Sequence, residues 1–353
     1  MSLRIVAALV LFSASWVHGQ IGGQSTFGFL NLGYSARTIG LGKDFITAVD
    51  DDVTLGLATP SLLNPAHHKN ASFSHSILSG GLNYGQFGYA HQLKNSGMIS
   101  GHIRYMSYGK MDLTLPNGEV AGNFTAGDVI VGAGYGHKLN EIISVGANLN
   151  FIFSTLETYQ AFGISADLSG TFNFADKRTV VTAVVRNAGV QLAGYTSKNR
   201  EPIAANPMLG VSHRLKHAPF RISVLMHHLH KWDLTYNDPN AQPTVDPLSG
   251  ELTEVEKAGF FEKLGRHFTF QLETILGKYI HIRAAFDYHQ RQEMKVVDRT
   301  GVAGFSFGFG LMMKKFQIQY GINVISAAGF NNMFTLSTNI GEWKKRSKST
   351  TTD

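Results

Sequence analysis

The feature that most constrains this chain is a repeated two-residue alternation of apolar and polar side chains. Residues 143–153 show it clearly, with apolar side chains at the odd positions from Ile143 to Phe153 and small or polar ones at the even positions from Ser144 to Asn150. Successive side chains of a strand point to opposite faces, so this pattern predicts a strand with one apolar face. Such runs span about ten residues, the length that a tilted strand needs to cross a bilayer.

The alternation predicts fourteen strands that close into a transmembrane antiparallel β-barrel, an all-β fold. An even number of strands places both termini on one side, which is the periplasm for a bacterial outer-membrane barrel. Short basic connections at every second position read as periplasmic turns, and the intervening connections read as surface loops. The strands are expected at residues 70–78, 82–93, 98–108, 125–138, 142–155, 158–173, 178–187, 205–216, 219–231, 265–275, 278–289, 303–313, 315–325 and 330–341.

Alternation alone also fits a soluble β-sandwich with its apolar face inside. Two further features favour the membrane barrel. Residues 1–19 have the form of an export signal peptide, with Arg4 before an apolar run from Ile5 to Phe12. Only 16% of the residues are charged, whereas an average soluble domain has about 25%. No apolar run after the signal is long enough for a helical membrane span.

Several classes of function are disfavoured by what the sequence lacks. The chain has no Cys, which excludes disulfide scaffolds, thiolate catalysis and thiolate-bound metals. Its formal net charge of +6 comes from scattered basic residues, so nucleic-acid binding has no support beyond the overall charge. We find no Ser-His-Asp order, phosphate-binding glycine loop or paired catalytic carboxylates. A non-enzymatic protein without a cofactor is therefore expected.

The segment 20–68 does not alternate and precedes the first predicted strand. It mixes apolar residues with turn residues, which suggests a plug or hatch folded inside the barrel, with a periplasmic arm as the alternative. Asp50, Asp51 and Asp52 lie in it. Three adjacent carboxylates lack the ligand spacing of a calcium loop, so we expect them to bond barrel arginines. The barrel then spans residues 69–343, and a basic tail, expected to be disordered, spans 344–353.

Two predicted surface loops are longer than a hairpin needs, and loops of that length are usually functional or disordered. They span residues 188–204 and 232–264, and the second includes an acidic, potentially helical stretch near residues 251–262. A third loop, 109–124, is expected to extend a hairpin above the membrane. Aromatic side chains often carry binding energy at interfaces, while an aromatic girdle at the membrane surface is the alternative. The candidate partner-binding residues are Tyr195, Arg200, Trp232, Asp233, Tyr236 and Asp238.

The run from His227 to His230 resembles a metal-binding sequence at first sight. On the predicted strand 219–231, however, His227 and His228 point to opposite faces, and only His228 and His230 share one. Two imidazoles on one face are too few for a closed zinc site. We therefore predict no metal site.

Several short motifs give the chain a resemblance to the PorQ-type outer-membrane proteins of the Bacteroidota type IX secretion system, which lie near the FadL-like and PorV-like barrels. The resemblance runs from about Gln20 to Trp343. The Trp-Asp-Leu-Thr-Tyr loop is its most specific part, whereas the aspartate and Asn-Pro motifs are shared with related barrels. The motifs are Gln20-Ile-Gly-Gly, Phe29-Leu-Asn-Leu, Ser35-Ala-Arg37, Asp50-Asp-Asp-Val53, Pro60-Ser-Leu-Leu-Asn-Pro65, Asn199-Arg-Glu-Pro202 and Lys231-Trp-Asp-Leu-Thr-Tyr-Asn-Asp-Pro239.

This resemblance implies a non-enzymatic anchoring role in the outer membrane. Such a barrel would hold a PorZ-like surface protein in an attachment complex that also contains a PorV-like barrel and a PorU-like sortase, and that joins secreted cargo to anionic lipopolysaccharide. Outer-membrane lipid would be a further partner. The alternative is a FadL-like transporter of hydrophobic small molecules with the N-terminal segment as a movable hatch. A continuous apolar pocket under the hatch would favour transport, and a filled polar lumen would favour anchoring.

Overall fold

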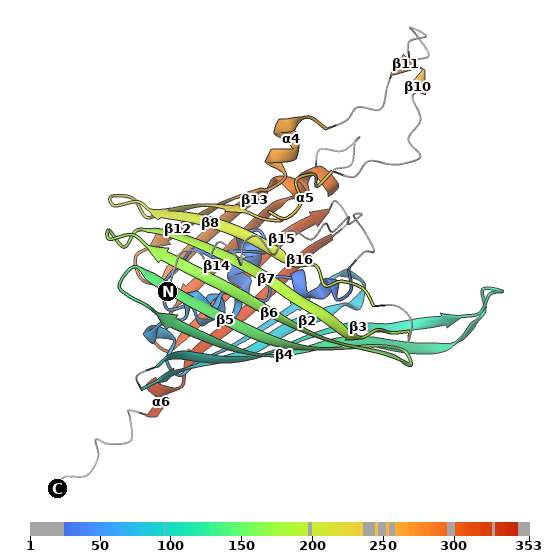
Figure 1. Cartoon of the computed structure of the whole chain (residues 1–353), viewed down its shortest axis with the longest axis horizontal. Coiled ribbons are helices and arrows are strands. Elements are labelled where there is room, and N and C mark those ends of the chain that lie inside the picture. Colours follow the sequence, from blue (N-terminus) through green and yellow to red (C-terminus); the bar gives the residue numbers. More distant parts are fainter. Residues whose placement is uncertain are drawn as a thin grey trace, which may run out of the picture.

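The chain folds as a closed antiparallel barrel of fourteen strands, as the alternation predicts (Figure 1). The computed structural model describes residues 25–94, 96–196, 200–235, 244–245, 252–253, 258–294, 301–326 and 329–344. The barrel strands are β1 (Asn70–Ile77), β2 (Asn83–Leu93), β3 (Gly97–Thr114), β4 (Val120–Lys138), β5 (Ile143–Leu156), β6 (Tyr159–Asn173), β7 (Thr179–Ala193), β8 (Asn206–Arg214), β9 (Phe220–Met226), β12 (Phe268–Leu276), β13 (Ile280–Asp287), β14 (Phe305–Met312), β15 (Phe316–Ser326) and β16 (Gly329–Asn339).

Each strand pairs with its sequence neighbour, and β1 closes the barrel against β16 with Asn70 opposite Asn339 and Ile77 opposite Asn332. Closure leaves no barrel strand with an unpaired edge. The barrel has two unlike ends, which we call the turn end and the loop end. The turn end carries the six short connections β2–β3, β4–β5, β6–β7, β8–β9, β12–β13 and β14–β15, together with α6 (Gly341–Lys344). The loop end carries the other connections.

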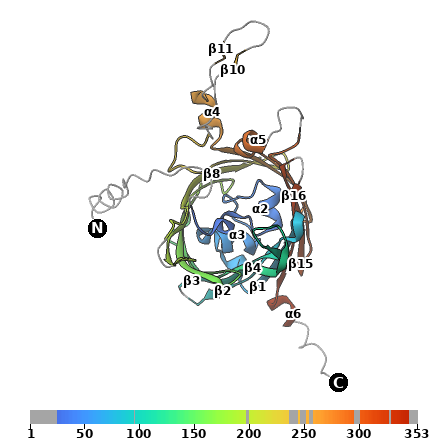
Figure 2. The same ribbon diagram turned by 90° about the vertical axis from the view of Figure 1, so that its right-hand side faces the viewer.

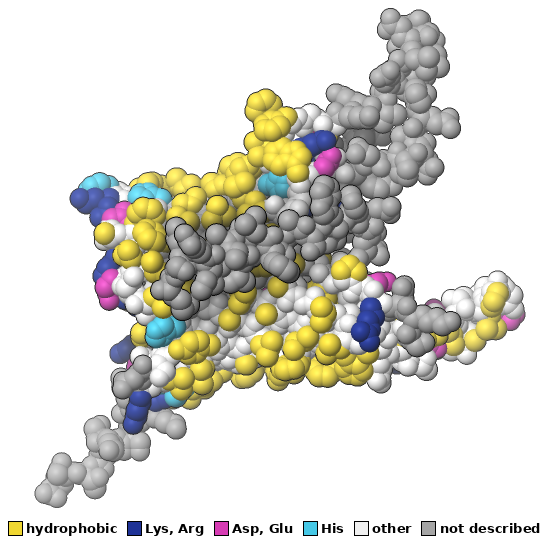
Figure 3. All heavy atoms as spheres, in the orientation of Figure 1, with side chains coloured by type: hydrophobic (Ala, Val, Ile, Leu, Met, Phe, Trp, Pro, Cys, Tyr) yellow, Lys and Arg dark blue, Asp and Glu magenta, His cyan; other side chains and the backbone are white. Residues whose placement is uncertain are grey.

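The barrel wall is apolar outside and polar inside, the reverse of a soluble sandwich. On β5, Leu149, Phe151 and Phe153 are 43–46% exposed on the outer surface, while Asn148 and Asn150 are buried in the interior. The same alternation repeats around the barrel and covers much of its visible outer face with hydrophobic side chains (Figure 3). This arrangement excludes the soluble sandwich as the fold. Among the described residues, no helix is long and apolar enough to cross a membrane.

Residues 25–69 lie inside the barrel, as the view down its axis shows (Figure 2). Their path consists of short helices joined by turns. They pack against the inner face of the wall through several apolar clusters, one of which joins Phe29 of this segment to Ile130 and Ile152 of β4 and β5. The helices are η1 (Gly28–Asn31), α2 (Ala36–Gly40), α3 (Val53–Ala58), η2 (Pro60–Leu62) and η3 (Pro65–His67).

Strand lengths differ from the alternation-based prediction at the loop end. β3 and β4 continue beyond the barrel as a paired hairpin (Figure 1) because their pairing resumes between Lys110 and Thr125 after a register shift. β7 extends to Ala193, past the predicted end at residue 187. β9 ends at Met226 rather than at residue 231, because His228 has a left-handed φ of 55° that interrupts the strand.

The connection between β9 and β12 contains two short elements. β10 (Thr244–Val245) pairs with β11 (Leu252–Thr253), and α4 (Phe260–Gly265) follows. The predicted helical stretch near 251–262 is therefore helical only from Phe260 among its described residues. Two loop-end helices were not predicted, namely α5 (Tyr288–Met294) after β13 and the single turn η4 (Ser79–Gly81).

Candidate functional site

The helix α2 is held against the barrel wall by a capping box and by close backbone contacts. The Ser35 hydroxyl accepts a hydrogen bond from the Thr38 amide at 3.2 Å, and the Thr38 hydroxyl accepts one from the Ser35 amide at 3.3 Å. A Cβ added to Gly321 of β15 would overlap the carbonyl oxygen of Ala36. A glycine is therefore needed at Gly321 for the helix to lie this close to the wall.

This placement directs Arg37 of α2 into the lumen, where it binds two carboxylates at once. It donates to Glu273 of β12 through Nε and Nη2, both at 2.9 Å, and to Asp50 through Nη1 and Nη2 at 2.9 and 2.8 Å. The carboxylate of Asp52, which also caps α3, lies 3.5 Å from Nη1. Paired bonds from a guanidinium to carboxylates are among the strongest in proteins. Arg37 thus joins the N-terminal segment to the barrel.

Two arginines of the wall complete this arrangement. Arg221 of β9 donates to Glu273 at 2.6 Å and to Asp50 at 3.4 Å, and Arg283 of β13 donates to Glu273 at 2.9 Å. Three guanidinium groups therefore balance three carboxylates. We call this set the ion cluster. Its members are Arg37, Asp50, Asp52, Arg221, Glu273 and Arg283.

The ion cluster is charged although it is mostly buried. The side chains of Arg37 and Glu273 are each 1% exposed, and that of Asp50 is 23% exposed. Burial would raise the pKa of Asp50, but the charge and hydrogen bonds of Arg37 and the charge of Arg221 outweigh it and hold this pKa far below its usual range. For Asp51, burial and the neighbouring Asp50 charge raise the pKa instead. Asp51 accepts a bond from Gln317 of β15 at 2.9 Å.

The lumen around the N-terminal segment is polar and filled. The wall contributes buried hydroxyl, amide and charged side chains, several of which bond the segment directly. Ser212 donates to the Thr47 carbonyl at 2.5 Å, and Gln271 donates to the Leu41 carbonyl at 2.7 Å. Buried polar residues of the wall include Ser74, Gln86, Arg104, Asn148, Asp167, Thr182, Ser212, Gln271, Ser306, Gln319, Asn331 and Thr335.

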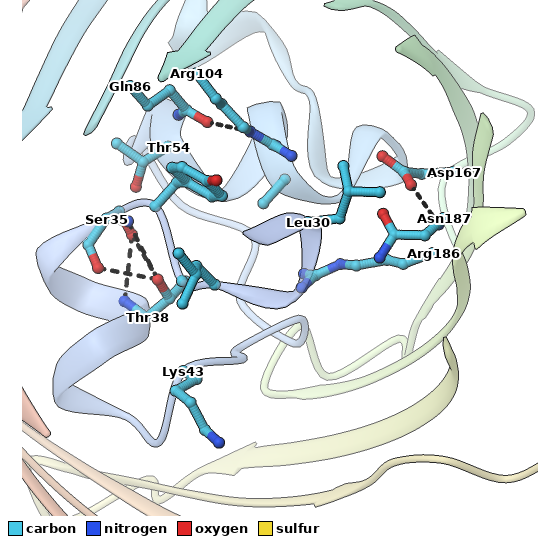
Figure 4. Close-up of a pocket in the computed structure, with 14 residues that line it drawn as sticks. Leu30, Ser35, Thr38, Lys43, Thr54, Gln86, Arg104, Asp167, Arg186 and Asn187 are labelled. Carbon is cyan, nitrogen blue, oxygen red and sulfur yellow. Dashed lines mark hydrogen bonds between the residues drawn. The ribbon is translucent and has the colours of Figure 1, made fainter. Parts of the chain in front are cut away.

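One interior cavity beside the segment is small and polar (Figure 4). Gln86 and Arg104 lie on one side of it, joined by a 2.8 Å hydrogen bond, and Asp167 and Asn187 lie on another, joined at 2.9 Å. The centre of a water molecule can reach about 20 Å³ of this cavity, which is room for roughly one water. The arrangement can hold water, but it has no space for an organic molecule.

The candidate residues Trp232 and Asp233 lie at the loop end beside α4. The Trp232 ring is 50% exposed and lies 5.4 Å from the Phe260 ring, centroid to centroid. Asp233 pairs with Lys263 at 2.6 Å. Burial would raise the pKa of Asp233, but the hydrogen bonds from Lys263 and Thr235 lower it to about 2. The start of the β9–β12 connection is therefore fixed to α4, while the rings of Trp232 and Phe260 remain exposed.

The other candidate residues do not join this group. Tyr195 is half-buried, and its ring packs against the apolar cluster around Phe29 while its hydroxyl contacts Ser154 of β5. Arg200 is exposed. Tyr236 and Asp238 lie outside the described residues, as do residues 1–24 of the predicted signal and segment and residues 345–353 of the tail.

The histidines near β9 meet two others that are distant in sequence. The ring of His228 lies 4.9 Å from that of His227 and 6.1 Å from that of His289 of α5, centroid to centroid. Nδ1 of His267 donates a 2.8 Å hydrogen bond to the His227 carbonyl. Among the described residues, no three His, Asp or Glu side chains stand where they could hold a metal ion.

Sequence reasoning missed four members of the ion cluster, namely Arg37, Arg221, Glu273 and Arg283. A signal was present, because Glu273 and Arg283 occupy the polar positions of alternating strands. The alternation predicts only that these side chains face the lumen. What they bind depends on which strands are neighbours and at which register, and the alternation does not contain that information.

No protein family model matches this chain, and no curated protein matches it. Solved structures do. The toluene transporter TodX of Pseudomonas putida has a TM-score of 0.54 at 11% identity, covering 87% of this chain and 98% of TodX. A deltaS2 mutant of TodX, described as a monoaromatic hydrocarbon channel, has a TM-score of 0.53 at 12% identity, covering 88% and 99%. At these identities the likeness concerns the fold alone: the chain has the barrel fold of TodX.

Proposed function

We propose that this protein is an outer-membrane barrel that anchors a partner protein at the cell surface. The filled polar lumen is the observation that carries this proposal. The N-terminal segment occupies the interior and is fixed to β9 and β12 by the ion cluster, in which Arg37 binds Glu273 at 2.9 Å and Asp50 binds Arg221 at 3.4 Å. A barrel sealed in this way is suited to holding something at its loops, and poorly suited to passing molecules through its lumen.

The outer surface supports a membrane location. A wall that exposes a large hydrophobic side chain on every strand would aggregate in water, whereas lipid covers such a surface favourably. The fold shared with TodX agrees with this location. We place the turn end in the periplasm and the loop end outside the cell, because short turns face the periplasm in bacterial barrels and the described C-terminal helix α6 lies at the turn end.

The loop end offers two surfaces for a partner. One is the paired extension of β3 and β4, whose tip exposes Leu113, Leu115 and Val120 by 39%, 45% and 60%. The other is the ring group of Trp232 and Phe260 at α4. Aromatic and aliphatic side chains of this kind serve as anchors in protein interfaces. A stiff hairpin loses little conformational entropy when it binds, which favours affinity.

We assign the partner by the resemblance of the sequence motifs to PorQ-type proteins. On that basis the barrel holds a PorZ-like surface protein, with a PorV-like barrel and a PorU-like sortase in the same complex, and it has no catalytic activity of its own. The experiment is a pull-down from outer membranes in mild detergent, with mass spectrometry of the co-purified proteins. Recovery of a large surface protein together with a sortase is expected. A barrel that purifies alone would contradict the proposal.

The ring group at the loop end is tested by deleting residues 232–264, which removes Trp232 and nearly all of α4 but leaves the paired strands β9 and β12. We expect an inserted barrel that releases its partner into the medium, and unchanged surface retention would count against the assignment. The competing function is transport of hydrophobic molecules, for which the fold of TodX is the motivation. Two results together would favour transport instead. Uptake of a hydrophobic substrate, or growth on it, would depend on this gene, and the purified barrel would hold a lipid-like ligand in its lumen.

A further inference from the structure

The turn end of the barrel is strongly cationic. Each of its six short turns carries Lys or Arg, at the end of a strand or within the turn, and only two carboxylates accompany them. Charged side chains gather at this end in the space-filling view (Figure 3). The cationic residues are Lys94, Lys138, Lys177, Arg178, Arg214, Lys216, Lys278, Lys314 and Lys315, and the carboxylates are Glu141 and Asp176.

Two hollows concentrate this charge at the turns β6–β7 and β8–β9. One has a volume of about 340 Å³ and the other about 450 Å³, and Lys177, Arg178 and Arg214 line both. The first hollow adds Lys138 and Arg221, together with the carboxylate of Glu141. The second hollow adds Lys216 and His217 of the β8–β9 turn, and no carboxylate lines it. The three shared residues thus form a cationic ridge between the hollows.

The charge of this ridge is only partly compensated within the described part of the chain. Glu141 is already paired with Lys138 at 2.9 Å. Asp176 accepts hydrogen bonds from the backbone amides of Arg178 at 2.9 Å and Thr179 at 3.2 Å. No described carboxylate lies within ion-pair distance of Lys177, Arg178 or Arg214. Nine cationic side chains against two carboxylates at the six turns therefore present a net positive field to an anionic partner.

The first hollow also has an apolar side. The N-terminal segment contributes Val49, which is 41% exposed, together with Leu63 and Pro65, and the wall contributes Val180. Because these residues come from both the segment and the wall, the hollow opens at the mouth of the barrel, inside the ring of strands. Lipid head groups lie outside that ring. A mixed apolar and cationic hollow in this position matches a polypeptide that carries both carboxylates and apolar side chains.

The geometry points to a docking site for an acidic, extended segment of another protein at the turn-end mouth, along the ridge of Lys177, Arg178 and Arg214. If the orientation given under the proposed function holds, this partner is periplasmic. The site is separate from the loop-end surfaces, so the barrel would join a partner outside the cell to one inside the envelope. Failure of the loop-end experiments would leave this inference standing, because its test uses only the purified barrel.

The test measures binding of a fluorescent peptide of alternating Glu and Leu to the full-length barrel in nanodiscs of zwitterionic lipid, by anisotropy. A Lys-Leu peptide of equal length is the control ligand. We expect saturable binding of the acidic peptide alone, weakened by raising the salt concentration. The double variant Arg178→Glu, Arg214→Glu should bind about tenfold more weakly. Arg178→Gln with Arg214→Gln gives a milder version should the first variant fail to fold.

The matched control is Lys94→Glu with Lys314→Glu, which makes the same charge change at the same end, at two turns that line neither hollow and do not adjoin the turns β6–β7 and β8–β9. This variant should keep its affinity within about twofold, since further turns separate the two substitutions from the ridge and salt screens exposed charges that are far apart. Equal loss in both double variants would mean general attraction to a basic surface and would overturn the site. Binding of anionic vesicles that depends on Arg178 and Arg214, with peptide binding unaffected, would overturn it in favour of lipid.

Discussion

Removing Arg37 tests whether the ion cluster keeps the N-terminal segment in the lumen. The Arg37→Met substitution deletes a guanidinium that is 1% exposed and that bonds Glu273 and Asp50 at 2.8–2.9 Å. It leaves three carboxylates facing two cations, so one buried negative charge loses its partner. Breaking a buried ion pair in this way costs about 3–5 kcal/mol. Because about 1.4 kcal/mol is a factor of ten, displacement of the segment should become roughly a thousandfold more favourable.

The assay is single-channel recording in planar bilayers, combined with limited proteolysis of residues 25–69. We expect the unmodified barrel to be silent and resistant, and the Arg37→Met barrel to show openings and to be cut inside the segment. Lys43→Met is the control on the same segment, because Lys43 is 38% exposed and its nitrogen lies 3.9 Å from Asp287, a pair worth little in water. If Arg37→Met stays as silent and as resistant as Lys43→Met, the ion cluster does not hold the segment.

A second substitution distinguishes charge balance from loss of contacts. Adding Asp50→Asn to Arg37→Met leaves Arg221 and Arg283 facing Glu273 and Asp52, which restores the balance of charge while Glu273 keeps both arginines. Removing both charges of a buried pair costs much less than leaving one of them unpaired. The double variant should therefore open less often than Arg37→Met alone, by about tenfold or more. Equal or more frequent opening would show that the hydrogen bonds themselves, and not the balance of charge, retain the segment.

Three further outcomes are expected. Gly321→Ala should destabilise the folded barrel by about 1–3 kcal/mol in a urea titration, because the added methyl overlaps the Ala36 carbonyl; Gly170→Ala, with no atom near its Cβ, should not, and equal effects would refute the packing argument. Burial above all, then neighbouring histidines, lowers the pKa of His228 to about 3, so the unfolded loop, with a pKa near 6.5, binds a proton that the folded loop does not. The loop should thus be fully stable above pH 6.5 and should lose stability as the pH falls toward 3. Hydrogen exchange of the loop amides, corrected for the intrinsic pH dependence of exchange, measures the free energy of loop opening, and a value that does not change over this pH range would contradict the prediction. Val120→Asp should reduce partner retention on cells while the barrel still inserts, and unchanged retention would remove the hairpin tip from the interface.

The sequence by itself determined the barrel. The two-residue period, the length of the runs and the short basic connections at every second position predict an even-numbered antiparallel barrel, and the structure confirms fourteen strands. These features are local, since the side-chain direction along a strand follows from backbone geometry alone. Where the prediction was wrong, a local conformation outside the pattern intervened, as at His228, whose positive φ ends β9 early.

Only the tertiary structure decided which partners the polar side chains of the wall bind. Arg37 and Glu273 are 236 residues apart, and their contact needs both the register of the barrel and the seating of α2 against Gly321. The cationic ridge likewise needs two turns to lie side by side at one mouth. Alternation tells which face a side chain occupies, but contact between distant residues depends on strand order and on shear, and these are properties of the closed barrel as a whole.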